Sequence, residues 1–187
     1  MPRAGLDPAA VVAAGAALAD EVGITHLTMG LLAERVGVRT PSLYKHVAGQ
    51  DDLNRRIAAL ALNEAADAVG SAVQGYAGRD ALGAAARAFR AFVLEHPGRY
   101  AATIGVEPTG PDDPMAAAGQ RLLGAFTAVL RGYEVAESDV NHALRLLRSL
   151  CHGFATLQSA GGFQWSTDVD ESFEWLIRFA DRGLRAM

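Results

Sequence analysis

Residues 28–53 read TMGLLAERVGVRTPSLYKHVAGQDDL and carry the strongest structural signal in the chain. Thr28 can cap a helix from Met29 to Val36, and Gly37 can end that helix in the left-handed conformation. Thr40-Pro41 repeats the start signal of a capping residue followed by proline, which predicts a short second helix over 39–47. Two helices joined by a tight turn, the second short enough for a major groove about 12 Å wide, are typical of a helix-turn-helix.

Apolar residues at helical spacing continue on both sides of this stretch, and no strand-like alternation is sustained. Glycine and proline divide the chain into segments, and Gly75 and Gly78 mark the clearest boundary. The first helix of the motif is expected to turn Leu31, Leu32 and Val36 inward. We predict an all-α fold of about nine helices, at 8–22, 29–36, 39–47, 51–70, 80–96, 99–104, 115–131, 138–160 and 169–184. Residues 1–50 are expected to form the helix-turn-helix domain and 51–187 a larger helical domain, with helix 51–70 connecting them.

Charge is distributed unevenly along the 187 residues. A net charge of −4 indicates that the whole chain is no general binder of polyanions, so any contact with nucleic acid requires a local patch. Residues 1–56 hold six basic and six acidic side chains, whereas the remaining 131 residues hold 11 basic and 15 acidic ones. The only lysine, Lys45, lies in the predicted second helix of the motif.

Cellular location can be predicted from cysteine usage and hydropathy. A single cysteine, Cys151, excludes an internal disulfide and fits a reducing compartment. The N-terminus lacks the pattern of a secretory signal, and no apolar run approaches the roughly 20 residues that span a bilayer. We therefore expect a soluble, cytoplasmic protein with no membrane partner.

The pattern Thr28-x-x-x-Leu32-Ala33-Glu34-Arg35-Val36-Gly37-Val38, followed by Ser42-Leu43-Tyr44-Lys45-His46-Val47 and Asp51-Asp52-Leu53, resembles the signature of the TetR family of bacterial transcriptional regulators. This resemblance covers about the first third of the chain. It implies an all-α fold in which three N-terminal helices bind DNA, while the C-terminal helices dimerise and hold an inducer pocket. The partners it implies are double-stranded DNA, a small-molecule effector and a second copy of the chain.

The resemblance also implies which residues meet DNA. Thr28 would contact a phosphate, Arg39, Thr40 and Ser42 would face bases or phosphates, and Tyr44, Lys45 and His46 would hold the backbone. Their chemistry agrees, because hydroxyl, ammonium and imidazole groups donate to phosphate oxygens and arginine can read guanine with two hydrogen bonds. The predicted set is Thr28, Arg39, Thr40, Pro41, Ser42, Tyr44, Lys45, His46 and Gln50.

Two positions depart from the family pattern, and several have a second interpretation. The family usually has a lysine near Gln50 and often an aromatic residue at Val47, so we expect fewer ionic contacts here. Tyr44 could instead pack under the first helix, as Leu43 and Val47 are expected to do. Lys45 could be a solvated charge, and Arg55 and Arg56 are interpreted in that way.

The C-terminal part carries weaker signals. The chain resembles a TetR subgroup with a His-Gly pair in its penultimate helix, where Cys151 replaces the usual aromatic residue. The residues that carry this resemblance are Phe89, Phe92, Val93, His96-Pro97-Gly98-Arg99-Tyr100 and Leu150-Cys151-His152-Gly153-Phe154. A ligand site needs apolar walls with a few polar groups. Candidate lining residues are therefore Phe92, Tyr100, Phe126, Cys151, His152 and Trp165. An aromatic residue at helical spacing is more often part of the core than of a ligand site, and His152 could equally be a core histidine bonded to a carbonyl.

An enzyme is the main alternative class, and Cys151-His152 is the pair that would support it. Adjacent residues on a helix point about 100° apart, so these two cannot form a nucleophile and base with each other. His142 and His152 are ten residues apart, which is no metal-site spacing. We expect no enzyme activity, no cofactor and no metal. The last two helices carry broad apolar faces and are expected to pair with those of a second copy.

These observations predict a homodimeric repressor that binds a palindromic operator and is released by a small molecule. An activator, or a regulator that needs no ligand, would show the same N-terminal helices. A helical enzyme using Cys151 and His152 is the more distant alternative.

Overall fold

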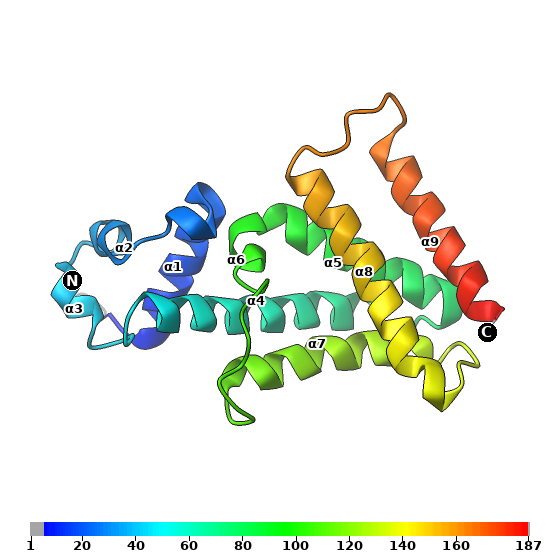
Figure 1. Ribbon diagram of the computed structural model, residues 1–187, viewed down its shortest axis with the longest axis horizontal. Coiled ribbons are helices and arrows are strands. Elements are labelled where there is room, and N and C mark those ends of the chain that lie inside the picture. The colour runs from blue at the N-terminus through cyan, green and yellow to red at the C-terminus, as the bar shows by residue number, and fades with distance from the viewer. Residues whose placement is uncertain (1–5, 187) are drawn as a thin grey trace. The chain divides into compact units, whose positions relative to one another are not determined.

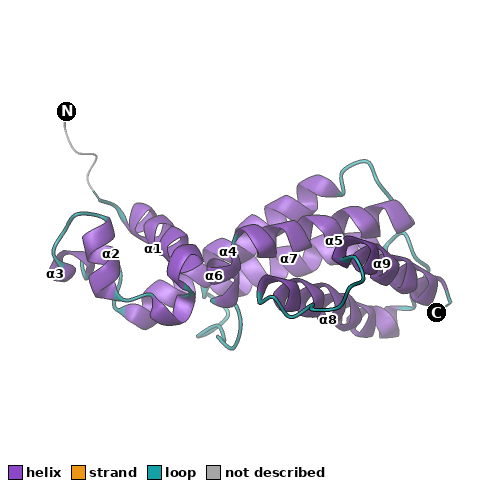
Figure 2. Cartoon of the chain, turned by 90° about the horizontal axis from the view of Figure 1, so that it is seen from above, coloured by secondary structure: helices purple, strands orange, loops and turns teal. Residues whose placement is uncertain are grey.

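The computed structural model describes residues 6–186, in which helices joined by loops are the regular structure and no strand occurs (Figures 1 and 2). Arg3, counted above among the basic residues of the N-terminal segment, lies outside the described residues. The all-α prediction is confirmed. The α-helices are α1 (Pro8–Val22), α2 (Met29–Arg35), α3 (Thr40–Leu43), α4 (Gln50–Ala72), α5 (Gly78–Glu95), α6 (Pro97–Ala101), α7 (Pro114–Leu130), α8 (Val140–Ser159) and α9 (Val169–Arg185), with short 3-10 turns at Ile24–His26 and Glu137–Asp139.

The chain divides into two compact units. The first contains residues up to Leu62 together with His96–Gly119, and the second contains Asn63–Glu95 together with the residues after Gly119. The long helix α4 therefore begins in one unit and continues into the other. Residues 96–119, which follow α5 in sequence, pack with the N-terminal helices. The division into a DNA-binding part and a ligand-binding part at residue 50 stays a prediction.

Capping residues start the N-terminal helices where the sequence indicates. The Asp7 carboxylate accepts from the Ala10 amide at 2.7 Å, and the Thr28 hydroxyl accepts from the Leu31 amide at 3.2 Å. Gly23 and Gly37, with φ of 83° and 71°, end α1 and the first helix of the motif in a conformation that favours glycine. Leu32, Leu43, Val47, Leu53 and Ile57 are among the buried residues that hold these helices together.

Two local predictions were wrong. The second helix of the motif ends at Leu43 rather than near Val47, and residues 44–46 form a turn in which the His46 and Val47 amides donate to the Leu43 carbonyl. Leu31 does not face inward: it lies on the solvent-exposed side of α2, whereas Leu32 is buried in the core. A helix only seven residues long buries a narrow stripe, which leaves one of two adjacent leucines outside.

Helix α6 is attached to α1 inside the first unit. Gly98 lies so close to α1 that a Cβ atom there would stand 1.8 Å from the Ala19 carbonyl oxygen. The Asp20 carboxylate accepts from the Arg99 amide at 2.8 Å and from Arg99 Nε at 2.7 Å, and His96 Nδ1 lies 3.4 Å away. Asp20 of α1 therefore caps the start of α6.

The second unit is built on α5, which packs against both α8 and α9 (Figure 1). Its buried aromatic and aliphatic side chains include Phe89, Phe92, Leu147, Phe173 and Ile177. Where α7 ends, the Tyr133 hydroxyl donates to buried Asp181 of α9 at 2.8 Å. Within the described residues, no helix is apolar enough over sufficient length to cross a lipid bilayer.

Candidate functional site

The predicted DNA-contacting residues all lie in the first unit, on α2, α3, the turn that follows α3, and the start of α4. None of the nine is buried: Thr28, Arg39, Pro41, Tyr44 and Lys45 are exposed, and Thr40, Ser42, His46 and Gln50 are half-buried. Leu43 and Val47, in the same segment, are buried in the core as expected. The segment is thus held by its apolar side chains and presents its polar ones to solvent.

Tyr44 is 56% exposed, so it does not pack under α1. Its hydroxyl is available to donate to an acceptor outside the chain, such as a phosphate oxygen. The other hydroxyl in the set, at Thr28, accepts from the Leu31 amide and keeps its own proton to donate. Gln50 donates one amide proton to Asn54 Oδ1 at 2.9 Å and retains a second.

The basic residues near the motif fall into two groups. Arg35 makes a bidentate ion pair with Glu21, and Arg56 donates a hydrogen bond to the Asp52 carboxylate at 3.1 Å. Arg39 and Lys45 make no ion pair or hydrogen bond with any described residue. Because an exposed cation without an internal partner can neutralise a phosphate at little cost, these two are the strongest candidates for contact with DNA.

Asp52 fixes the turn that joins the motif to α4. Its carboxylate accepts from the Ala48 amide at 2.8 Å and pairs with Arg56, one turn further along α4. Burial raises the pKa of this carboxyl, but the hydrogen bond from Ala48 and the pair with Arg56 outweigh it, and the pKa lies below its usual value. Ionised Asp52 therefore holds in place the backbone that leads away from Lys45.

Five of the predicted ligand-lining residues are buried or half-buried, and they are divided between the two units. Phe92, Phe126 and Cys151 are buried in the second unit, with His152 half-buried there, whereas Tyr100 is buried in the first unit. Trp165 is 79% exposed on the linker between α8 and α9. Phe126 meets Phe89 edge-on at 5.9 Å, so it is packed as a core residue is.

Two polar groups in this set, the Cys151 thiol and the His152 imidazole, have pKa values shifted towards the neutral form. Burial raises the pKa of the Cys151 thiol to about 12, which makes it a poor nucleophile. Burial and the nearby charge of Arg148 lower the pKa of His152. Both side chains could therefore lie beside an uncharged ligand without the cost of a buried charge.

Two surface hollows involve none of the predicted ligand residues. One, of about 680 Å³, lies between the first turns of α4 and residues 109–114, and the other, of about 290 Å³, lies between α5 and α9. Sequence reasoning also missed Arg90, which contacts Gln158 and Asp170. Its partners are 68 and 80 residues away in the chain, and no local pattern indicates such a contact.

Comparison with known proteins finds one match to the C-terminal part of the chain and others along nearly its whole length. The profile of the family described as Tetracyclin repressor-like, C-terminal domain, matches residues 82–180. The chain is 32% identical over 186 residues to YobS, an uncharacterised HTH-type transcriptional regulator of Bacillus subtilis strain 168, covering 98% of this chain and 95% of YobS.

Two crystal structures extend the comparison to three dimensions. A protein of Streptomyces coelicolor A3(2), described as a possible TetR family transcriptional regulator, is 26% identical with a TM-score of 0.76, covering 96% of this chain and 99% of that one. A single-residue variant of TetR from Acinetobacter baumannii AYE, in complex with minocycline, is also 26% identical with a TM-score of 0.73, covering 96% of each chain. The chain belongs to the TetR family of helix-turn-helix transcriptional regulators.

Proposed function

We propose that this DNA-binding regulator is a homodimeric repressor that holds a palindromic operator through α3 and the adjoining turns, and leaves it when a small molecule occupies its C-terminal helices. The observation that carries the DNA-binding part is the state of Arg39 and Lys45, which are exposed and without an ion pair among the described residues. They flank a helix whose apolar residue Leu43 is fully buried. Under this proposal the protein acts in the cytoplasm, where the DNA that it binds lies.

The residues divide into two roles under this proposal. Arg39, Thr40 and Ser42, at the exposed start of α3, read base edges in the major groove, with Pro41 fixing the first turn. Thr28, Tyr44, Lys45, His46 and Gln50 donate to phosphates and set the position of the helix. Lys45 thus contributes affinity for any DNA, whereas Arg39 contributes sequence preference.

Two alanine variants test this division. Lys45→Ala is expected to weaken binding to all DNA sequences and to reduce the slope of log affinity against log salt by about one unit. Arg39→Ala is expected to relax the preference at one base position, at a cost of about 1–3 kcal/mol for the preferred base. Binding is measured on an operator selected from random double-stranded DNA.

Arg35→Ala is the matched control, because Arg35 lies on α2 and is already paired with Glu21. It is expected to leave the salt dependence and the base preference unchanged. Operator binding that is unaltered in both Lys45→Ala and Arg39→Ala would overturn the assignment of the contact segment.

The dimer is supported by apolar side chains that α8 and α9 leave exposed. Leu146 and Leu157 lie outward on α8, and the stacked rings of Trp175 and Phe179 lie outward on α9 with centroids 5.4 Å apart. Gly153, between the two leucines, has open space where a Cβ would be. Two copies related by a twofold axis would bury these faces in a four-helix bundle.

The ligand-dependent part is supported by the minocycline complex of the A. baumannii protein and by the attachment of α6 to α1. Helix α6 carries Tyr100, one of the candidate lining residues, and Asp20 and Ala19 of α1 hold its first turn. A ligand that shifts α6 would therefore displace the first helix of the DNA-binding part.

A thermal-shift screen of small molecules tests the ligand-dependent part. Compounds that stabilise the protein by binding are expected to lower its operator affinity, because a ligand shifts the equilibrium by its differential affinity for the two states. A stabilising compound that leaves operator affinity unchanged would favour a ligand-independent regulator. The position of the footprint relative to the promoter separates a repressor from an activator.

A further inference from the structure

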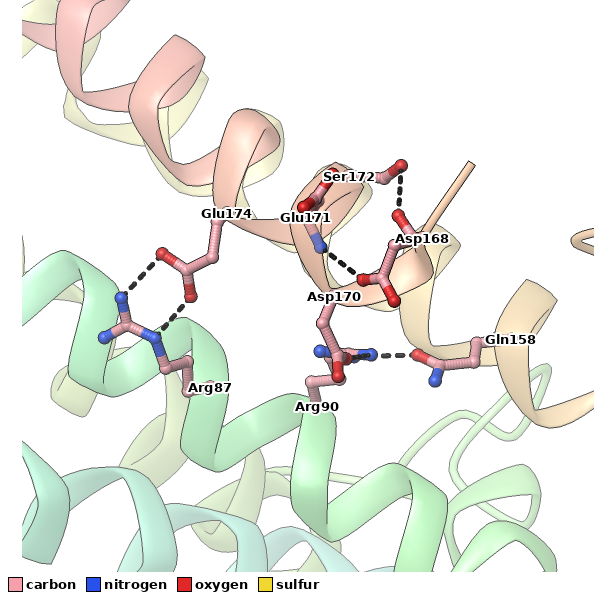
Figure 3. A network of polar contacts seen from close by, with 8 residues as sticks. All are labelled: Arg87, Arg90, Gln158, Asp168, Asp170, Glu171, Ser172 and Glu174. Carbon is pink, nitrogen blue, oxygen red and sulfur yellow. Dashed lines mark hydrogen bonds and ion pairs between the residues drawn. The ribbon is translucent and has the colours of Figure 1, made fainter. Parts of the chain in front are cut away.

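Arg90 of α5 contacts the end of α8 and the start of α9 with a single guanidinium group (Figure 3). Its Nε donates to Gln158 Oε1 at 2.7 Å, in the last turn of α8. Its Nη2 donates to Asp170 Oδ1 at 2.5 Å, in the first turn of α9. The planar, forked geometry of a guanidinium allows it to meet both partners at once, which a lysine ammonium could not do in the same way.

Two aromatic rings complete the surroundings of this group. The Arg90 guanidinium lies 4.7 Å from the centroid of Phe173 on α9 and 5.6 Å from that of Phe154 on α8. The two rings are themselves 4.9 Å apart. The Arg90 side chain is only 13% exposed, so these cation–π contacts are screened by little water. Each of the two helices thus supplies one polar partner and one ring.

Arg87, one turn earlier on α5, provides a natural comparison (Figure 3). It forms two hydrogen bonds with Glu174 of α9, at 2.6 and 2.8 Å. Its side chain is 54% exposed, and these two bonds bind it to α9. Arg87 therefore joins α5 to α9, whereas Arg90 joins α5, α8 and α9 together.

The linker between α8 and α9 contacts α8 through Phe163, whose ring centroid lies 4.7 Å from that of Phe154. Residues 160–168 contain no helix, and Gly161, with φ of 68°, ends α8 in the left-handed conformation. Asp168 begins α9 by accepting from the Glu171 amide at 2.9 Å, a contact internal to that helix (Figure 3). The relative placement of the two helix ends must therefore come largely from side-chain contacts.

We propose that Arg90 is a positioning residue for the dimer surface: it fixes the end of α8 against the start of α9, so that their exposed apolar faces form one continuous surface for a second copy. This inference rests on the homodimer of the proposed function. A dimer surface contributed by two helices needs both in a fixed relation, because shape complementarity is lost when one of them shifts. Removal of Arg90 should weaken dimerisation beyond its effect on folding.

The test compares Arg90→Met with Arg87→Met, each of which replaces an arginine by an uncharged chain of similar length. The dimer dissociation constant is measured by analytical ultracentrifugation over a dilution series, and the melting temperature and helicity by circular dichroism. Arg90→Met is expected to raise the dissociation constant on the order of tenfold, and Arg87→Met by less than about threefold. Helicity should be that of the wild type in both.

Gln158→Ala provides a second variant that leaves the core and the α5–α9 contacts in place. It removes only the polar partner on α8, and it is expected to weaken the dimer while retaining the wild-type helicity. If Arg90→Met fails to fold, this variant decides: a wild-type dissociation constant in Gln158→Ala overturns the inference. The inference is also overturned if Arg90→Met and Arg87→Met have the same dimer dissociation constant.

The wild-type protein separates this inference from the proposed function. A wild type that stays monomeric over the dilution series contradicts the homodimer itself, and this inference with it. A wild type that dimerises, together with an Arg90→Met variant that dimerises as tightly, contradicts only the role of Arg90.

Discussion

Gly98 allows α6 to lie close against the backbone of α1, and its replacement is expected to destabilise the fold. A Cβ atom would stand 1.8 Å from the Ala19 carbonyl oxygen and 2.6 Å from the Asp20 amide, both of them backbone atoms. Gly98→Ala therefore forces α6 away from α1, and we expect a loss of about 1–3 kcal/mol in the free energy of unfolding. This change in the free energy of unfolding is measured by chemical denaturation.

Gly124, inside α7, is the control for this substitution because a Cβ atom there would have nothing within 4 Å of it. Gly124→Ala is expected to stabilise the protein by about 0.5–1 kcal/mol through the better helix propensity of alanine. Equal effects at the two glycines would show that the α1–α6 contact is looser than the structure indicates.

Asp52 gives the turn after α3 a dependence on pH. Its pKa is lower in the folded protein than the usual aspartate value of 3.8, so the ionised carboxylate stabilises the fold above that value. This stabilisation is lost as the pH falls through the folded-state pKa. Asp52→Asn is therefore expected to cost on the order of 1 kcal/mol near pH 7 and less as the pH falls below 3.8 towards the folded-state pKa, measured by denaturation over a series of pH values. Asp51→Asn, at the exposed neighbouring residue, is the control because it removes a charge beside Asp52 and leaves the bond between Asp52 and the Ala48 amide in place.

At the scale of elements, the buried Tyr133–Asp181 pair holds α9 to the end of α7. Tyr133 donates to Asp181 at 2.8 Å, and Arg185 donates to the same oxygen at 3.1 Å. Tyr133→Phe removes one partner of a buried carboxylate, and we expect a loss of about 1–3 kcal/mol in unfolding free energy. Burial and the Asp181 charge raise the pKa of Tyr133 above the usual tyrosine pKa of about 10. In the wild type the hydrogen bond therefore stabilises the fold fully below about pH 10, and this stabilisation is lost as the pH rises through the folded-state pKa. A variant as stable as the wild type at pH 7 would contradict this role.

Element boundaries were predictable from the sequence wherever a local signal marks them. Asp7-Pro8 and Thr28 cap their helices as expected, and the predicted ends of the long helices lie within a few residues of those observed. The length of α3 was not predictable, because the turn at residues 44–46 retains the spacing of apolar residues that a helix would have. A period of 3.6 residues cannot distinguish one helical turn from a hydrogen-bonded turn that follows it.

The candidate sites were predictable to a different extent. The DNA-contacting set is local in sequence, and all nine residues reach at least partly into solvent as the motif requires. Whether they touch DNA stays a prediction. The ligand set depends on contacts between distant helices, and Tyr100 and Trp165 show the difficulty: one is buried in the first unit and the other is exposed on a linker. Arg90 depends on such contacts too, so only the fold revealed it.

In the whole molecule, the proposed homodimer implies that operator recognition depends on a second copy of the chain. A single α3 of four residues contacts too few bases for strong selectivity, whereas two copies can read half-sites about 34 Å apart along one face of DNA. The two DNA-binding units of a dimer then bind the operator together. Once the first unit is bound, the second is held at a high effective concentration near its half-site, so the dimer binds the full operator more tightly than one unit binds one half-site. Loss of the dimer should therefore weaken binding even when every DNA-contacting residue is intact.

Trp175→Glu tests this dependence, because Trp175 is exposed on α9 and stacks on Phe179 at the proposed dimer face. A carboxylate there buries one charge from each copy in the proposed apolar interface, so the variant is expected to be monomeric at micromolar concentration while remaining helical. Operator affinity should fall on the order of a hundredfold, and affinity for a single half-site should not change. Leu123→Glu, at an exposed leucine of α7 in the same unit, is expected to leave both the dimer and operator binding intact. A monomeric Trp175→Glu that binds the full operator as tightly as the wild type would mean that each chain recognises its site alone.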